Sequence, residues 1–128
     1  MIIVDEAIGG NRLRAFTVES LDEKLTVREI IRARIWQEVH EYNSQQQSIE
    51  FQGLIRPTDA ELTLNQSKAA AFRPIDWEKQ YQTALQAFQS NGFFILIGDR
   101  QAESLDEVFA TGAETEVSFV KFTPLVGG

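Results

Sequence analysis

The chain has 128 residues, a length that suits one domain with a single core. With 43% hydrophobic and 24% charged residues it has the composition of an ordinary globular protein, which excludes disordered and repetitive chains. Its 19 acidic against 12 basic residues give a net charge of -7, so we expect no nucleic acid and no membrane surface as partner, because phosphate groups would be repelled.

The first elements are predicted to form a β-hairpin. Two β-prone runs, residues 1–8 and 12–18, are joined by Gly9, Gly10 and Asn11, which adopt positive φ readily in tight turns. The opening residues include no basic segment and no long apolar stretch, so we expect neither a secretory signal nor a membrane span. The expected location is the cytoplasm.

A long amphipathic helix is predicted next. Thr26 and Glu29 form a capping box that starts a helix ending near Asn43. Its apolar face contains Val27, Ile30, Ile31, Ile35, Val39 and Tyr42, so it should pack on a sheet. Glu38 interrupts this face, and we expect it to pair with Arg34 at the flank, whereas His40 lies off the face and should be solvated.

The middle of the chain is predicted to be an insertion spanning about residues 49–92. A short strand at 49–55 is stopped by Pro57, and 58–73 is ambiguous between a short strand at Leu62 and Leu64 and a helical turn at 69–71. A second helix is capped by Asp76 and stopped by residues 91–92. Its core-facing stripe is Trp77, Tyr81, Ala84, Leu85 and Phe88.

The last third of the chain alternates strands and turns. We predict a buried strand at 93–97, a turn at 98–99 and a returning strand at 100–103. Residues 104–109 are expected to form a compact acidic loop or a single helical turn, and 117–122 a final strand that Pro124 ends. The fold class is therefore α+β, with one sheet and a packed helix in residues 1–123.

We expect residues 124–128 to form a flexible C-terminal tail that is free of the body of the domain. This tail is the part of the chain with the clearest chemical function. Gly127 and Gly128 have no side chains, so an extended backbone can enter a narrow slot and present the terminal carboxylate. Pro124 limits the freedom of this tail, which lowers the entropy lost on docking. A carboxylate becomes reactive once it attacks the α-phosphate of ATP and forms an acyl-adenylate. Because the chain contains neither a P-loop nor a nucleotide-binding fingerprint, we expect it to be the substrate of that reaction and not an enzyme.

Residues 93–128 resemble the C-terminal half of the ubiquitin-like β-grasp proteins. Residues 95–101 are similar to their strand-turn-strand and 116–122 to their last strand, while Pro124, Leu125, Val126, Gly127 and Gly128 resemble the tails of the molybdopterin synthase small subunit and the thiazole-pathway sulfur carrier. The resemblance implies a mixed β-grasp sheet. It also implies that an E1-like adenylating enzyme activates Gly128, with residues 124–127 as the docked tail, and that the product is a thiocarboxylate or an amide conjugate. E2-like and metallopeptidase proteins are possible further partners.

Other readings of the sequence remain open. The alternative function is a non-catalytic β-grasp interaction module in which the tail is incidental. The four phenylalanines at 93, 94, 119 and 122 alternate on two strands, so one pair must face away from the main helix, and we expect the insertion to bury it rather than leave a docking patch. The acidic pairs Asp5–Glu6, Asp106–Glu107 and Glu114–Glu116 are expected to be solvated. With no cysteine and one histidine, no cofactor or metal is expected.

Overall fold

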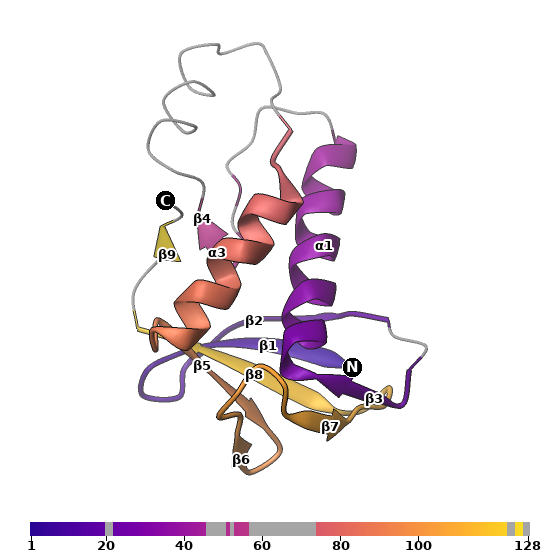
Figure 1. Ribbon diagram of the computed structural model, residues 1–128, viewed down its shortest axis with the longest axis vertical. Helices are drawn as coiled ribbons and strands as arrows, with labels where there is room; N and C mark the ends of the chain where they lie inside the picture. The colour runs from indigo at the N-terminus through magenta and orange to yellow at the C-terminus, as the bar shows by residue number, and fades with distance from the viewer. Residues whose placement is uncertain (20–21, 46–50, 52, 57–73, 123–124, 127–128) are drawn as a thin grey trace.

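The computed structural model describes residues 1–19, 22–45, 51, 53–56, 74–122 and 125–126 (Figure 1). A five-stranded mixed sheet forms one layer, and the two helices of this part of the chain stand on the same side of it. The prediction of an α+β class with one principal sheet is therefore confirmed. The undecided residues 58–73 lie outside the described residues.

The order of the principal sheet is β2-β1-β8-β5-β6. Strand β1 (Ile2–Ala7) pairs antiparallel with β2 (Arg12–Thr17) and parallel with β8 (Glu116–Lys121). Strand β5 (Phe93–Ile97) lies antiparallel to both β8 and β6 (Arg100–Gln101). The first strand of the chain and its last long strand thus lie side by side at the centre.

The N-terminal hairpin turns where the sequence predicts it. Gly9 and Gly10 have φ values of 101° and 94°, a left-handed conformation that costs glycine little. The amide of Ala7 donates to the carbonyl oxygen of Asn11 across the turn, at 2.9 Å. This closure fixes the register of β1 against β2, and so decides which side chains of β1 face the helices.

Both helices begin at the predicted caps. In α1 (Val27–Gln45), the amide of Glu29 donates to Thr26 Oγ1 and the amide of Thr26 donates to Glu29 Oε1, which lowers the pKa of Glu29. In α3 (Trp77–Gln89), Asp76 Oδ1 accepts from the amides of Glu78 and Lys79. The apolar stripe predicted for α3 needs one revision, because Gln80 is buried whereas Trp77 and Tyr81 are partly buried.

Two small sheets complete the described structure. Strand β3 (Lys24–Thr26) pairs antiparallel with β7 (Val108–Ala110), and β4 (Ile55–Arg56) pairs parallel with β9 (Leu125–Val126). The expectation of a loop or helical turn over 104–109 is wrong at its end, where β7 begins. Segments of two or three residues are too short to show an alternating pattern, so their pairing depends on tertiary contacts.

The core contains a buried ion-pair cluster as well as apolar side chains. Arg34 is fully buried and donates through both terminal nitrogens to the two carboxylate oxygens of Asp5, and through Nε to Glu38 Oε1 at 2.8 Å. The Arg34 guanidinium also lies 4.4 Å from the centre of the Phe119 ring. Arg34 and Glu38 do pair, but the prediction that they meet at the flank of α1 is wrong, and so is the prediction that Asp5 is solvated.

Electrostatics keep this arginine charged despite its burial. Burial by itself would lower the pKa of Arg34, but attraction by Glu38 and the hydrogen bonds to Asp5 outweigh it and raise the pKa above its ordinary value. Arg14 and Lys121 approach from the sides, with Arg14 Nη2 3.1 Å from Glu38 Oε1 and Lys121 Nζ 3.6 Å from Asp5 Oδ2. The two carboxylates are thus surrounded by positive charge from β2, α1 and β8.

The four phenylalanines divide between the two faces of the sheet. Phe93 and Phe119 are fully buried and stack with their ring centres 5.8 Å apart, beneath the helices. Phe94 and Phe122 pack edge-to-face on the opposite side, with ring centres 5.0 Å apart. Because Phe122 keeps 38% of its surface exposed, the expectation that this outer pair is buried under the insertion is wrong.

Replacement of the central arginine should destabilise the fold strongly. Arg34→Met keeps much of the apolar stem but leaves Asp5 and Glu38 as buried carboxylates without their main partner, so we expect a loss of about 3–5 kcal/mol in the free energy of unfolding. Urea denaturation measures it.

The matched control is Arg12→Met, which removes the exposed ion pair of Arg12 with Glu116 and should cost less than about 1 kcal/mol. Equal losses from the two substitutions would contradict the role assigned to the buried cluster.

Candidate functional site

The last long strand of the chain ends at the centre of the principal sheet. Strand β8 ends at Lys121 between β1 and β5, and Phe122 follows on the face opposite the helices. Of the five predicted tail residues, Pro124, Gly127 and Gly128 lie outside the described residues. The structure therefore describes the tail at Leu125 and Val126.

These two tail residues form a parallel pair with a strand of the middle region. Leu125 lies opposite Ile55 and Val126 opposite Arg56. Figure 1 shows β9 and β4 next to each other beside α3, at a distance from the principal sheet. The prediction that the tail is free of the body is therefore wrong at Leu125 and Val126, which pair with residues 55–56.

Strand β4 is itself firmly anchored in the core. The side chains of Leu54 and Ile55 are each 1% exposed, and the amide of Leu54 donates to Glu38 Oε2 at 3.0 Å. Just before them, the ring of Phe51 packs edge-on against Tyr42 of α1, with centres 5.3 Å apart. Burial raises the pKa of the Tyr42 hydroxyl. The strand that receives the tail is therefore fixed to α1 by apolar packing and by a charge-assisted hydrogen bond.

Gly53 allows this close approach of the chain to α1. A Cβ atom at this position would lie 2.6 Å from both Glu38 Oε2 and Phe51 Cε2, which is closer than real side chains come. Any larger residue would have to move the Phe51 ring, the Glu38 carboxylate or the backbone that leads into β4. Glycine is needed here because of the space and not because of an unusual φ.

Glu38 links the tail region to the ion-pair cluster. Its Oε1 accepts from Arg34 and Arg14, while its Oε2 accepts from the amide of Leu54. The sequence identified Glu38 as a polar residue within the apolar face of the helix and as a partner of Arg34, but not as a partner of the Leu54 amide. The position of Glu38 within the apolar face indicates buried partners, because a buried carboxylate must be paired or hydrogen-bonded. The identity of the backbone amide that it binds depends on the tertiary structure.

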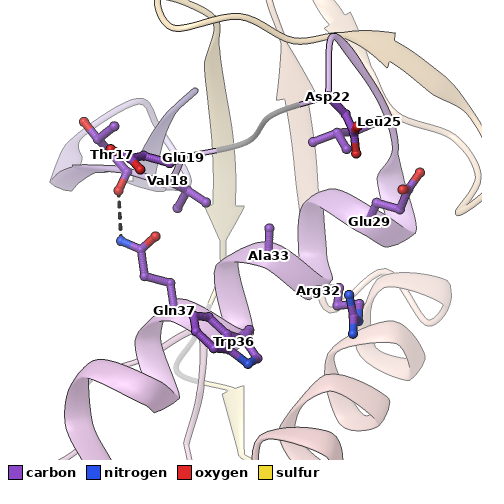
Figure 2. Close-up of a pocket in the computed structure, with 10 residues that line it drawn as sticks. All are labelled: Thr17, Val18, Glu19, Asp22, Leu25, Glu29, Arg32, Ala33, Trp36 and Gln37. Atoms are coloured by element: carbon purple, nitrogen blue, oxygen red, sulfur yellow. Dashed lines mark hydrogen bonds between the residues drawn. The ribbon is translucent and has the colours of Figure 1, made fainter. Parts of the chain in front are cut away.

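A concave region lies along one face of α1 (Figure 2). It has a volume of about 710 Å³ and lies between the end of β2, the approach to β3 and one face of α1. Its lining is mixed, with acidic, basic and apolar side chains: Thr17, Val18, Glu19, Asp22, Leu25, Glu29, Arg32, Ala33, Trp36 and Gln37. Gln37 Nε2 donates to the carbonyl oxygen of Thr17 across this space. The cleft combines an exposed aromatic ring with charges of both signs.

Several candidate residues prove to have structural contacts. His40 is exposed and stacks on Trp36 with ring centres 4.6 Å apart, in agreement with a surface position. Glu107 accepts from Arg100 and from the amide of Glu103, and Asp106 lies 3.6 Å from Arg28. Within the described residues, no set of three or more His, Cys, Asp or Glu side chains is placed to hold a metal ion. No helix among them is long and apolar enough to cross a bilayer.

The chain was compared with models of protein families, with curated proteins and with solved structures, and none of them matches it.

The anchoring of β4 by Glu38 can be tested by shortening this side chain. Glu38→Asp keeps the charge but removes one methylene, so one carboxylate no longer reaches both Arg34 and the amide of Leu54. We expect hydrogen exchange at the Leu54 amide to accelerate by about tenfold, the equivalent of one net hydrogen bond. NMR-detected exchange measures it.

The matched control is Glu41→Asp on the next turn of α1, where the side chain is exposed. That variant should leave exchange at Leu54 unchanged. An unaltered Leu54 amide in Glu38→Asp would contradict the proposed anchor.

Proposed function

We propose that this chain is a ubiquitin-like β-grasp protein whose Gly128 carboxylate is activated by an E1-like adenylating enzyme, and that it works as a protein modifier or a sulfur carrier. The supporting observation is the arrangement of the sheet around the C-terminal segment. Strand β8 pairs parallel with β1 at the centre of the order β2-β1-β8-β5-β6, and the tail follows β8 directly. An N-terminal hairpin, a packed helix and a central last strand are the features expected of a β-grasp domain.

A central strand gives the tail a rigid base. Strand β8 pairs with a neighbour on each side, and its inward side chains Val117 and Phe119 are fully buried. A partner enzyme that grips the domain therefore meets the start of the tail at a fixed position. Fixing the base lowers the entropy lost when residues 123–128 enter a narrow groove.

The chemistry proposed for Gly128 needs no catalytic group from this chain. A carboxylate oxygen attacks the α-phosphorus of ATP, the bond to pyrophosphate breaks, and an acyl-adenylate forms. A sulfur nucleophile then attacks the acyl carbon and AMP leaves, giving a thiocarboxylate, whereas a lysine amine gives an amide conjugate. In the conjugation route an E2-like protein carries the activated chain, and a metallopeptidase removes it from its target.

A non-catalytic interaction module is the second candidate, and two observations favour it. Leu125 and Val126 pair with β4 instead of extending away from the body. The outer face of the sheet also presents the Phe94–Phe122 pair, of which Phe122 is 38% exposed. In this alternative the outer face binds a protein partner and the carboxylate does no chemistry. The two candidates differ in their dependence on the last two residues.

The proposal predicts an ATP-dependent modification at Gly128. With a panel of purified E1-like adenylating enzymes and ATP, the intact chain should support exchange between pyrophosphate and ATP. Hydroxylamine should then trap a hydroxamate that tandem mass spectrometry places on Gly128. Adding a sulfur donor or an E2-like protein separates the two routes, because the first product gains sulfur and the second becomes joined to a lysine.

The control is the same chain without Gly127 and Gly128. It should keep the circular dichroism spectrum and thermal unfolding of the full chain and lose the exchange reaction. Exchange that persists without the two glycines, or a full-length chain that no enzyme of the panel modifies, would count against the carrier and favour the interaction module.

A further inference from the structure

Leu125 and Val126 have two potential binding partners. One is strand β4 of the same chain, and the other is the activating enzyme of the proposed function. We propose that β4 (Ile55–Arg56) is an intramolecular receptor strand that holds Leu125–Val126, so that the C-terminal carboxylate is withheld until a partner separates the two strands. We call the arrangement in which β4 is paired with Leu125–Val126 the closed state. Its biological meaning rests on the proposed function. The closed state itself can be measured without any activating enzyme.

A strand of two residues holds a peptide only if its own position is fixed. An isolated pair of such short strands is unstable in water, because ordering the backbone costs more than two or three hydrogen bonds return. Here Leu54 and Ile55 are buried, and the Leu54 amide is bound by Glu38, so β4 has contacts with the core besides its pairing with the tail. These contacts lower the ordering cost that the pairing itself must offset.

The body and an enzyme groove compete for the same segment. A groove that activates a terminal carboxylate must enclose the last residues of the chain, whereas in the closed state β4 occupies one side of Leu125 and Val126. The two arrangements exclude each other. Since the pairing is worth about one net hydrogen bond, the closed state lowers the fraction of accessible tails by about fivefold to tenfold.

The closed state is coupled to the core through Glu38. One oxygen of this carboxylate binds Arg34 and Arg14 in the ion-pair cluster, and the other binds the amide of Leu54 next to β4. A partner that moves residues 51–56 away from α1 would therefore release the tail without entering the principal sheet. This places the control of the tail in the middle region of the chain, outside the principal sheet.

The first test moves β4 by one methyl group. Gly53→Ala puts a Cβ atom 2.6 Å from Glu38 Oε2 and Phe51 Cε2, so the Glu38 carboxylate that binds the Leu54 amide, the Phe51 ring or the segment that leads into β4 must shift. The control is Gly112→Ala, where the new methyl meets only Thr115 Oγ1, at 3.8 Å. Hydrogen exchange measured by mass spectrometry on the peptide covering residues 123–128, together with the rate at which carboxypeptidase Y releases the terminal glycines, reports the open fraction.

We expect Gly53→Ala to accelerate both rates by about fivefold or more, and Gly112→Ala to leave them unchanged. Exchange of the wild-type tail as fast as that of a free peptide of the same sequence would overturn the proposal. So would a folded Gly53→Ala variant with wild-type rates.

The second test locks the pair. Because the chain has no cysteine, the double variants Ile55→Cys with Leu125→Cys and Arg56→Cys with Val126→Cys each introduce a unique pair at positions that face each other across the strands. A disulfide should form in at least one of them and stop carboxypeptidase Y, with full release restored by dithiothreitol. Failure of both folded variants to oxidise would overturn the proposal.

A third readout separates this inference from the proposed function. With an adenylating enzyme that accepts the chain, the locked variant should lose pyrophosphate exchange and regain it on reduction, and unchanged exchange by the locked variant would overturn the closed state. If no enzyme modifies the chain but the tail remains protected and responds to Gly53→Ala, the receptor strand is supported and the carrier function fails.

Discussion

The fold depends on one buried interaction, the set of ion pairs and hydrogen bonds that Arg34 makes with Asp5 and Glu38. Asp5 sits on β1 in the middle of the sheet, whereas Arg34 and Glu38 lie on successive turns of α1, so the cluster sets both the position and the rotation of the helix over the sheet. Apolar contacts tolerate sliding, but a bidentate ion pair does not, because a small displacement leaves buried charges unpaired. Specificity of packing is the main consequence of this cluster, since much of the attraction is offset by the loss of hydration.

The same cluster also connects helix α1 to the segment that leads into β4. One oxygen of Glu38 accepts from two arginine side chains and the other accepts from the amide of Leu54, so this carboxylate ties residues 53–56 to the helix. The tail pairs with the end of this segment. The middle of the chain therefore affects the access of an enzyme to Gly128 in the proposed function, because β4 pairs with the tail. The sequence of the tail alone does not indicate this. Fixing β4 through the core gives the tail a partner that a flexible loop would not provide.

The sheet separates two kinds of surface. Its inner face is sealed by α1, α3 and the stacked pair Phe93–Phe119, while its outer face bears Phe94 and Phe122 next to the start of the tail. The cleft beside Trp36 lies along one face of α1. A partner of the tail and a partner of the cleft would therefore approach the molecule from different directions.

The sequence by itself determined the long elements and the chemical character of the tail. The capping box at Thr26, the N-cap at Asp76 and the glycine turn at 9–10 act locally, so the helices and the hairpin begin where their residues predict. Local signals also identified Glu38 as an anomaly and residues 124–128 as the segment of interest.

Only the tertiary structure decided how these parts meet. The burial of Arg34 and Asp5, the strands β3 and β7, and the pairing of β4 with β9 join residues far apart in the chain. Charged side chains and two-residue strands look like surface features until the fold supplies their partners, because neither a local pattern nor a propensity encodes a contact at long range.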